Sequence, residues 1–446
     1  MNKVKKRTFV ILILAALLLI GVCWFLVQWE QDGGYWASYP SNDHAYSNGD
    51  FVTGKVMDRN GDLLLTDGLG SQREYMGDSE FRKANLYAVG DRKGNIGGAA
   101  TELFRDKMLG YSMINGVYSM SGKGGNVWLS VDSELNRTAY RALDGRAGCV
   151  AVMDHSNGQI LCMVSTRAFD PADPPSDADY LNKFLSGVFV PGSIFKLVTS
   201  WAALENLDMS EYSYYCDGSA DYQGASITCT HAHGQVDFNG ALAVSCNGAF
   251  ADIAQKLGGE TLREYAEKAG LTTSHEVSGF VTSEGNFEAA EEGTWNLGWS
   301  GAGQYNDLVN PYAMLRFISA IPNDGRAVDG ELISKATNGW GIPWWVDVKT
   351  GDDRIMSADT AAQLKMMMAN NVQSNYGVDN FPNLPLCAKS GTAEVAGNSP
   401  HAWFVGFLNS TEYPYTFVVL VENGGSGASV AGSIANTVLQ ELCFGE

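Results

Sequence analysis

Three short segments of the chain hold residue types that could together carry out acyl transfer. Ser193 and Lys196 form a Ser-x-x-Lys segment, Ser245 and Asn247 a Ser-x-Asn segment, and Lys389 opens a Lys-Ser-Gly-Thr segment. A serine hydroxyl attacks a carbonyl efficiently only when a base removes its proton, and a lysine with a lowered pKa is one such base. Each segment alone is common by chance, so the prediction depends on all three occurring together in this order.

The first segment is expected at the start of a buried helix. Pro191 and Gly192 interrupt the chain directly before Ser193, and apolar residues follow at helical spacing. Lys196 then lies about one turn from Ser193, on the same face. The pKa of Lys196 must fall for it to act as the base, and burial, the helix N-terminus and a second cation at Lys389 all favour that fall. The alternative is a lysine that extends from an amphipathic helix into solvent.

The second segment is expected in a loop between two helices, because stretches with helical apolar spacing lie on both sides of it. In that loop the hydroxyl of Ser245 could relay a proton between Lys196 and a substrate amine, while the amide of Asn247 orients the substrate. The alternative is an ordinary helix cap, for which serine and asparagine are preferred.

The third segment is expected on a β-strand. Gly391 would let a substrate approach the backbone closely. The amine of Lys389 and the hydroxyls of Ser390 and Thr392 could bind a carboxylate. The backbone N–H groups of Ser193 and Thr392 are candidates for an oxyanion hole. The alternative is an ordinary strand with one exposed lysine.

The elements that must position these segments include two β-strands at each end of the catalytic half. Apolar runs at 148–154 and 159–164 are joined by a turn-forming His-Ser-Asn-Gly sequence, and further runs cover 402–408 and 415–422. The apolar spacing at 428–443 predicts a closing helix. The predicted fold class is therefore α+β, in which distant parts of the chain form an antiparallel sheet flanked by helices and packed on a helical subdomain.

The N-terminal end is expected to anchor the chain in a membrane. An uninterrupted apolar run covers 9–27, and as a helix it spans close to the roughly 30 Å hydrocarbon core of a bilayer. Four basic residues precede it, so residues 1–8 are expected in the cytoplasm and the rest of the chain outside. The alternative, a cleaved signal peptide, is disfavoured by the length of the run and by the lack of a clear cleavage site. Residues 28–125 are expected to form a small non-catalytic module ending in a Gly-rich linker at 121–126, and residues 126–446 to form the catalytic domain.

Charge and cysteine content narrow the functions further. The chain has 30 basic and 50 acidic residues, and its net charge of −20 repels nucleic acid.

Cys216 and Cys229 flank a turn-rich segment that reads as a hairpin or loop, and we predict a disulfide between them. No Cys/His spacing matches a standard zinc site and His231 and His233 are predicted to be an ordinary loop pair, so no metal or cofactor is expected. The acidic segment at 58–62 has its glycine too early for a calcium loop and is predicted to be a turn between strands.

The three segments and their flanks resemble those of class B penicillin-binding proteins. The family pattern Pro-Gly-Ser-x-Phe-Lys is present at 191–196, Ser-x-Asn at 245–247, and Lys-Ser-Gly-Thr-Ala at 389–393, followed by His-Ala-Trp-Phe-Val-Gly-Phe at 401–407. The resemblance covers nearly the whole chain after the apolar run and is most specific in the catalytic half. It implies the penicillin-binding serine transpeptidase fold with an all-helical subdomain.

The resemblance also implies a peptidoglycan D,D-transpeptidase of the bacterial cell membrane. Ser193 would attack the carbonyl between the terminal D-alanines of a stem peptide, and an amine of a neighbouring stem peptide would accept the acyl group. β-Lactams would acylate the same serine, a separate membrane polymerase would supply the glycan strands, and no cofactor is implied. The alternatives are a D,D-carboxypeptidase or β-lactamase, in which water accepts the acyl group, and a non-catalytic scaffold that binds β-lactams.

Overall fold

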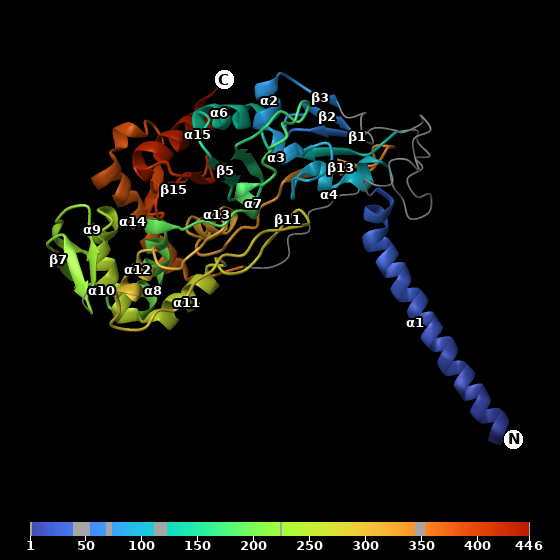
Figure 1. Cartoon of the computed structure of the whole chain (residues 1–446), viewed down its shortest axis with the longest axis horizontal. Coiled ribbons are helices and arrows are strands. Elements are labelled where there is room, and N and C mark those ends of the chain that lie inside the picture. Colours follow the sequence, from blue (N-terminus) through green and yellow to red (C-terminus); the bar gives the residue numbers. More distant parts are fainter. Residues whose placement is uncertain are drawn as a thin grey trace.

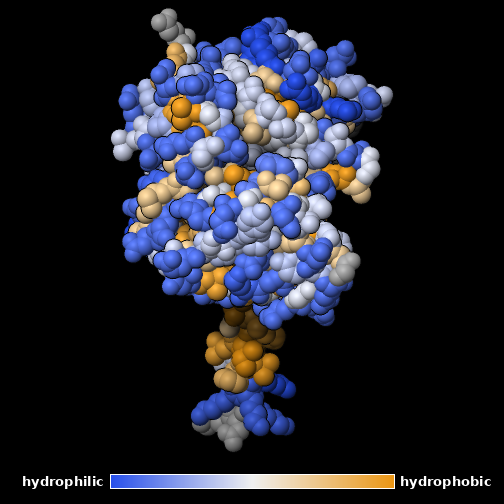
Figure 2. All heavy atoms as spheres, turned by 90° about the vertical axis from the view of Figure 1, so that its left-hand side faces the viewer, coloured by the Kyte–Doolittle hydropathy of each residue, from blue (hydrophilic) through white to orange (hydrophobic). Residues whose placement is uncertain are grey.

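The structure, a computed structural model, describes residues 2–38, 54–67, 74–110, 123–223, 225–343 and 353–445. A long helix, α1 (Asn2–Ser38), extends away from the body of the molecule (Figure 1). Figure 2 shows its hydrophobic surface between the body and a hydrophilic N-terminal end. Among the described residues, Lys3–Gly34 is the one stretch of helix long and apolar enough to cross a membrane, and its most apolar window is fully exposed. Such exposed apolar surface is what a bilayer-spanning helix presents.

The centre of the body is a five-stranded antiparallel sheet in the order β14-β15-β16-β5-β6. The predicted strands at both ends of the catalytic half, the hairpin between the first two, and the strand that carries Lys389 are confirmed. The observed bounds are β5 (Gly148–Asp154), β6 (Ile160–Thr166), β14 (Leu386–Ala393), β15 (His401–Leu408) and β16 (Tyr415–Val421).

Helices cover both faces of this sheet. Alternate residues of each strand point to opposite faces, so each face contributes to a separate apolar core. Val150 and Val152 of β5 belong to one apolar core, which they share with α6 (Ser133–Leu143) and α15 (Gly432–Phe444). Cys149, Ala151 and Met153 belong to the other core, which includes the helices that carry the first two motif segments. The predicted closing helix is present as a short π-helical turn, η6 (Gly427–Ala431), followed by α15.

A helical subdomain forms the end of the body farthest from the N-terminal sheet (Figure 1). Its central helix, α8 (Lys196–Asn206), carries the buried Trp201, whose ring stacks on that of Phe317 and meets that of Tyr265 edge to face. Two short antiparallel strand pairs are attached to this subdomain. One joins residues 213–216 to 234–237, and the other, formed by residues 219–222 and 225–228, is the predicted hairpin between Cys216 and Cys229. The elements are α8 (Lys196–Asn206), β7 (Ser213–Cys216), β8 (Ser219–Tyr222), β9 (Ala225–Thr228), β10 (Gly234–Asp237), α9 (Phe238–Ala243), α10 (Asn247–Leu257), α11 (Gly259–Lys268), α12 (Trp295–Gly301), α13 (Pro311–Ala320) and α14 (Ala358–Asn371).

A second five-stranded sheet, in the order β13-β4-β1-β2-β3, contains the strands of the N-terminal part. Its members are β1 (Gly54–Met57), β2 (Leu63–Asp67), β3 (Glu74–Tyr75), β4 (Asn126–Leu129) and β13 (Ile333–Thr337). The last two strands come from the range expected for the catalytic domain, so the sheet ties the two parts together. Residues 121 and 122 of the predicted linker lie outside the described residues.

The acidic segment at 58–62 is a turn between β1 and β2, as predicted. The buried carboxylate of Asp58 accepts hydrogen bonds from the backbone of Asn60 and Asp62, each at 2.9 Å, and from the hydroxyl of Ser133 at 2.7 Å. Because Asp58 is held by the protein's own donors, it stabilises the turn and the start of α6.

Candidate active site

Ser193 lies in a short 3-10 turn, η3 (Gly192–Phe195), that leads directly into α8. Every residue from 191 to 203 is buried except Ser193, which is half-buried. The turn lies against β14, because a Cβ on Gly192 would come within 2.9 Å of Ala393, and the φ of Gly192 is +57°. Glycine is therefore needed at this position on both counts. The turn presents one hydroxyl to solvent from an otherwise buried segment.

Lys196 opens α8 and is fully buried. Its Nζ donates to the carbonyl oxygen of Ser245 at 2.7 Å, to Ser245 Oγ at 3.1 Å and to Asn247 Oδ1 at 2.7 Å. Burial lowers the pKa of Lys196 to about 8, because the charged amine loses hydration. A substantial share of the amine is therefore neutral near neutral pH, as a general base requires.

The Ser245–Asn247 segment is a loop between α9 and α10, as predicted. Ser245 has a backbone φ of +56°, in the left-handed region that residues other than glycine rarely adopt. In this conformation Ser245 Oγ lies 3.1 Å from Lys196 Nζ and 3.2 Å from Lys389 Nζ, so one hydroxyl links two amines. Asn247 is the first residue of α10, and its Nδ2 donates to the carbonyl of Thr228 at 2.7 Å.

Lys389 lies in the middle of β14 and is fully buried. Its Nζ also donates to the carbonyl of Ser390 at 2.7 Å. Burial and then the nearby charge of Lys196 hold the pKa of Lys389 well below its ordinary value. Two buried amines that share one hydroxyl can exchange a proton through it.

The structure brings the three predicted segments together. Lys196, Ser245, Asn247 and Lys389 form one hydrogen-bonded cluster. A Cβ on Gly391 would lie 3.0 Å from the carbonyl oxygen of Pro191, so β14 lies beside the turn of Ser193. Ser390 is half-buried and Thr392 exposed on the same strand. Both side chains are accessible to a ligand. Thr392 Oγ1 accepts a hydrogen bond from the backbone N–H of Gly427 at 3.3 Å.

Tyr376 is a residue of the site that the sequence reasoning missed. It ends a π-helical turn, η4 (Val372–Tyr376), and is buried. Its hydroxyl lies 3.0 Å from Ser390 Oγ and accepts the backbone N–H of Ser390 at 2.8 Å. Burial raises the pKa of Tyr376, so it remains a neutral donor. A single tyrosine outside the three motifs carries no sequence pattern that could have identified it.

A comparison with protein families bears on this geometry. Residues 148–440 match the family described as the penicillin binding protein transpeptidase domain. The chain belongs to this family. It is a class B penicillin-binding protein, as the motifs predicted, and it has the transpeptidase fold.

Relatives of this penicillin-binding protein are recognisable at moderate identity. The peptidoglycan D,D-transpeptidase PbpA of Mycolicibacterium smegmatis is 26% identical over 347 residues, which cover 70% of each chain. Among solved structures, the D,D-transpeptidase domain of a peptidoglycan glycosyltransferase from Eggerthella lenta superimposes with a TM-score of 0.76 at 22% identity, covering 87% of this chain and 97% of that one. The penicillin G acyl-enzyme complex of penicillin-binding protein A from M. tuberculosis gives a TM-score of 0.76 at 21% identity, covering 88% and 99%.

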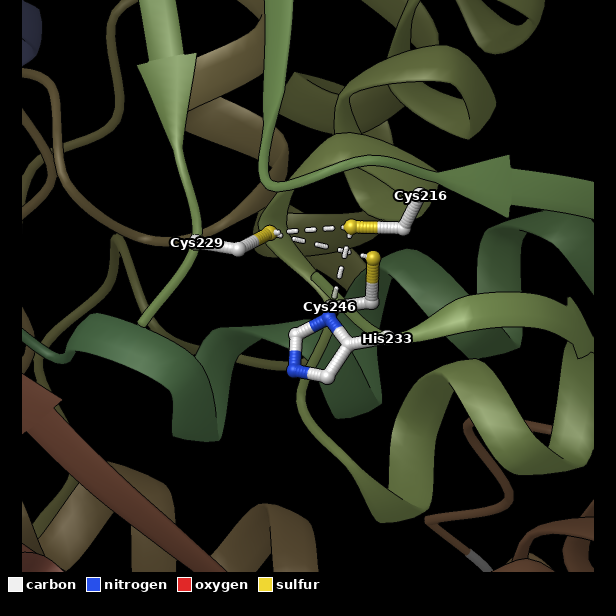
Figure 3. Close-up of side chains that lie close together, drawn as sticks. All are labelled: Cys216, Cys229, His233 and Cys246. Atoms are coloured by element: carbon white, nitrogen blue, oxygen red, sulfur yellow. Dashed lines mark hydrogen bonds between the residues drawn. The ribbon is translucent and has the colours of Figure 1, made fainter. Parts of the chain in front are cut away.

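Next to the Ser245–Asn247 loop of this penicillin-binding protein lies a cluster of three cysteines and a histidine: Cys216, Cys229, His233 and Cys246 (Figure 3). The predicted disulfide between Cys216 and Cys229 is wrong for this structure, because their Sγ atoms are 3.7 Å apart and a disulfide bond is about 2.0 Å long. The sulfur of Cys229 also lies 3.8 Å from that of Cys246, so it is shared between two neighbours.

Sequence spacing missed this cluster because its four members come from separate parts of the subdomain. The prediction that His231 and His233 are an ordinary loop pair stays a prediction, although His233 Nδ1 lies 3.4 Å from Cys216 Sγ. His231, two residues earlier, is exposed and hydrogen-bonds to Thr230 instead.

Proposed function

We propose that this chain is a peptidoglycan D,D-transpeptidase that cross-links stem peptides through an acyl-enzyme on Ser193, and that β-lactams acylate the same hydroxyl. The observation that carries the proposal is the pair of buried amines, Lys196 and Lys389, joined through Ser245 Oγ beside the one accessible side chain of the η3 turn. The names of the relatives agree with it: PbpA of M. smegmatis is named a peptidoglycan D,D-transpeptidase, and the M. tuberculosis protein was solved as a penicillin G acyl-enzyme.

The first step of the proposed reaction forms the acyl-enzyme. Neutral Lys196 takes the proton of Ser193 Oγ as that oxygen attacks the carbonyl between two D-alanines. The backbone N–H groups of Ser193 and Thr392 stabilise the oxyanion that forms. When the C–N bond breaks, the leaving D-alanine amine receives a proton through Ser245 Oγ, which already lies between the two lysines.

The second step transfers the acyl group. An amine of a neighbouring stem peptide attacks the ester on Ser193 and gives up its proton through Ser245, and Lys196 returns a proton to Ser193 Oγ. Asn247 orients the donor backbone, and its side chain is fixed for this by Lys196 and Thr228. Lys389, Ser390 and Thr392 bind the terminal carboxylate of the donor along β14, and Gly391 lets this strand lie against the turn of Ser193.

The location and partners follow from the N-terminal helix. We infer that residues 9–27 cross the bacterial cell membrane once, with residues 1–8 in the cytoplasm and the module at 28–125 and the transpeptidase domain at 126–446 outside. The exposed apolar surface of α1 supports the crossing, and the basic residues in its first two turns support the orientation. A separate membrane polymerase would supply the glycan strands that this chain cross-links.

Labelling with a fluorescent penicillin tests the proposed nucleophile. We expect the full-length chain in detergent to be labelled stoichiometrically and Ser193→Ala to remain unlabelled. Ser200→Ala is the matched control, because Ser200 lies on the adjoining helix and its buried Oγ has no hydrogen-bond partner among the described residues. Equal labelling of Ser193→Ala and wild type would refute the assignment, and an unlabelled wild type would refute acylation by β-lactams.

The fate of the acyl group separates the transpeptidase from its hydrolytic alternatives. With a stem-peptide donor and an added D-amino acid as acceptor, we expect mass spectrometry to detect the exchanged peptide as the main product. Predominant release of the shortened peptide acid would identify a D,D-carboxypeptidase. Rapid loss of the penicillin label with release of penicilloic acid would identify a β-lactamase.

A further inference from the structure

The Cys216, Cys229, His233 and Cys246 side chains point toward a common centre (Figure 3). One ligand atom from each residue lies within 4.8 Å of the others. The residues come from the end of β7, the end of β9, the turn before β10 and the loop before α10. The chain therefore places three sulfurs and one imidazole nitrogen together from four different segments.

Three of the six distances between these atoms match a tetrahedral zinc site. With zinc bonds of about 2.3 Å to sulfur and about 2.0 Å to nitrogen, a tetrahedron separates two sulfurs by about 3.8 Å and sulfur from nitrogen by about 3.5 Å. The structure has 3.7 Å between the sulfurs of Cys216 and Cys229, 3.8 Å between those of Cys229 and Cys246, and 3.4 Å from Cys216 Sγ to His233 Nδ1. The other three pairs lie within 4.8 Å, so the four side chains would close slightly around an ion at the centre.

The kind and number of ligands point to a structural transition-metal ion. Thiolates are soft ligands that select zinc over magnesium or calcium, and Cys₃His is a standard set for a closed tetrahedral zinc site. Cys216 and Cys246 are almost completely buried, and Cys229 and His233 are half-buried. All four positions would be filled by protein, so the ion would not bind substrate.

The position of Cys246 at the start of α10 also suits a negatively charged ligand. The sulfur of Cys246 caps α10 by accepting the backbone N–H of Ala249 at 3.4 Å. The N-terminal end of a helix stabilises negative charge, so this end of α10 can support the charge of the ligands.

We propose that Cys216, Cys229, His233 and Cys246 bind one zinc ion, and that this ion holds the Ser245–Asn247 loop in its working position. Cys246 lies between Ser245 and Asn247, the two residues that contact Lys196. Cys229 follows Thr228, whose carbonyl accepts from Asn247. The ion would thus join both small strand pairs to the loop whose serine has the left-handed φ. This positioning role depends on the proposed transpeptidase chemistry, whereas metal binding does not.

A disulfide is the competing interpretation, and the cluster argues against it. Three cysteines cannot all pair among themselves, so any disulfide would leave the third thiol and His233 without a role. A tetrahedral ion uses all four groups and protects the thiolates from oxidation outside the cytoplasm.

Metal analysis of the full-length chain in detergent tests the binding. After dialysis against chelator-free buffer containing zinc and then against metal-free buffer, we expect about one zinc per chain by elemental mass spectrometry. His233→Ala and Cys216→Ser should lose most of it, whereas His231→Ala and Cys443→Ser, their matched controls, should keep it. Equal zinc in all five proteins, or none in the wild type, would overturn the proposal.

A second measurement avoids the question of whether a variant folds. Cobalt added to the reduced, metal-free wild type should give the strong thiolate-to-metal and d–d absorption of a tetrahedral sulfur site. A disulfide among the three cysteines in mapped peptides of the zinc-treated protein, or only the weak spectrum of octahedral cobalt, would refute metal binding.

The positioning role has its own test. Removal of zinc by a chelator should slow penicillin acylation at Ser193 on the order of a hundredfold and lower the melting temperature, and added zinc should restore both. An unchanged acylation rate after zinc has been lost would refute the positioning role alone. Failure of the proposed transpeptidase function would look different, because a zinc-loaded wild type would then form no exchanged peptide from a stem-peptide donor and a D-amino acid.

Discussion

The acylation rate should depend on pH through Lys196. This amine is expected to act as base only when neutral, and burial lowers its pKa from 10.5 to about 8. The difference of 2.5 corresponds to about 300-fold more neutral amine at pH 7 than an exposed lysine would have. About one molecule in ten is then active at pH 7.

The groups that face Lys196 explain the direction of this shift. Loss of hydration is the main cause, while negative charge on Cys246 or Cys229 would act in the opposite direction. Lys389, across Ser245 Oγ, also has its pKa held well below the ordinary value, by burial and then by the nearby charge of Lys196. The titration of Lys196 is therefore expected to dominate the profile.

Stopped-flow acylation by a chromogenic or fluorescent penicillin, measured from pH 5.5 to 10, checks this expectation. The second-order rate constant should rise about tenfold per pH unit below pH 7 and level off above about pH 8, because protonation removes the base. Lys196→Arg should be inactive at every pH, since a guanidinium stays protonated. Lys256→Ala, on the exposed side of α10 and paired with Asp252, should keep the wild-type profile.

Two results would refute the reasoning about Lys196. A rate that is constant from pH 6 to 9 would mean that no group titrating near pH 8 controls acylation. A rate that still climbs at pH 10 would mean that the base has an ordinary lysine pKa and that burial does not activate it. Thermal melts over the same pH range would show that the fold is intact at each point.

Three further predictions concern neighbouring residues. Ser245→Ala should slow acylation about 10² to 10³-fold, because it removes the hydroxyl between the two lysines, and an unchanged rate in stopped flow would exclude the relay. Tyr376→Phe should lower the free energy of unfolding by about 1–3 kcal/mol, since the N–H of Ser390 loses its acceptor, and a denaturant midpoint equal to wild type would contradict this. Gly192→Ala should lose several kcal/mol of stability and most penicillin labelling, because its Cβ would lie 2.9 Å from Ala393 at a φ of +57°, whereas a wild-type melting temperature would show that the turn can relax.

Local patterns in the sequence predicted the parts of the fold that depend on local chemistry. The central strands were predicted because residues such as those at 148–154 and 415–421 form apolar runs bounded by turn residues. The loop at Ser245 was predicted from the helical spacing on either side. The start of the Ser193 helix differs in detail, since it is a 3-10 turn imposed by the close contact of Gly192 with β14.

Features that depend on distant parts of the chain were not predictable in this way. The contact of Tyr376 with Ser390 arises where a π-helical turn meets β14. The left-handed φ of Ser245 is set by tertiary contacts and carries no sequence signal. The cluster was missed because only Cys229 and His233 are close in sequence, and Cys216 and Cys246 join them only after two strand pairs have folded.

The place of β13 in the N-terminal sheet has a practical and mechanical consequence. A fragment that starts at residue 126 would retain β4 and β13 but lose β1, which pairs in parallel with β4. The bare edge of β4 would then be free to join other molecules, so such a fragment should precipitate where one beginning before Gly54 stays in solution. In the intact chain, a pull on β1 from the side of α1 would be transmitted through backbone hydrogen bonds to the strand at 333–337.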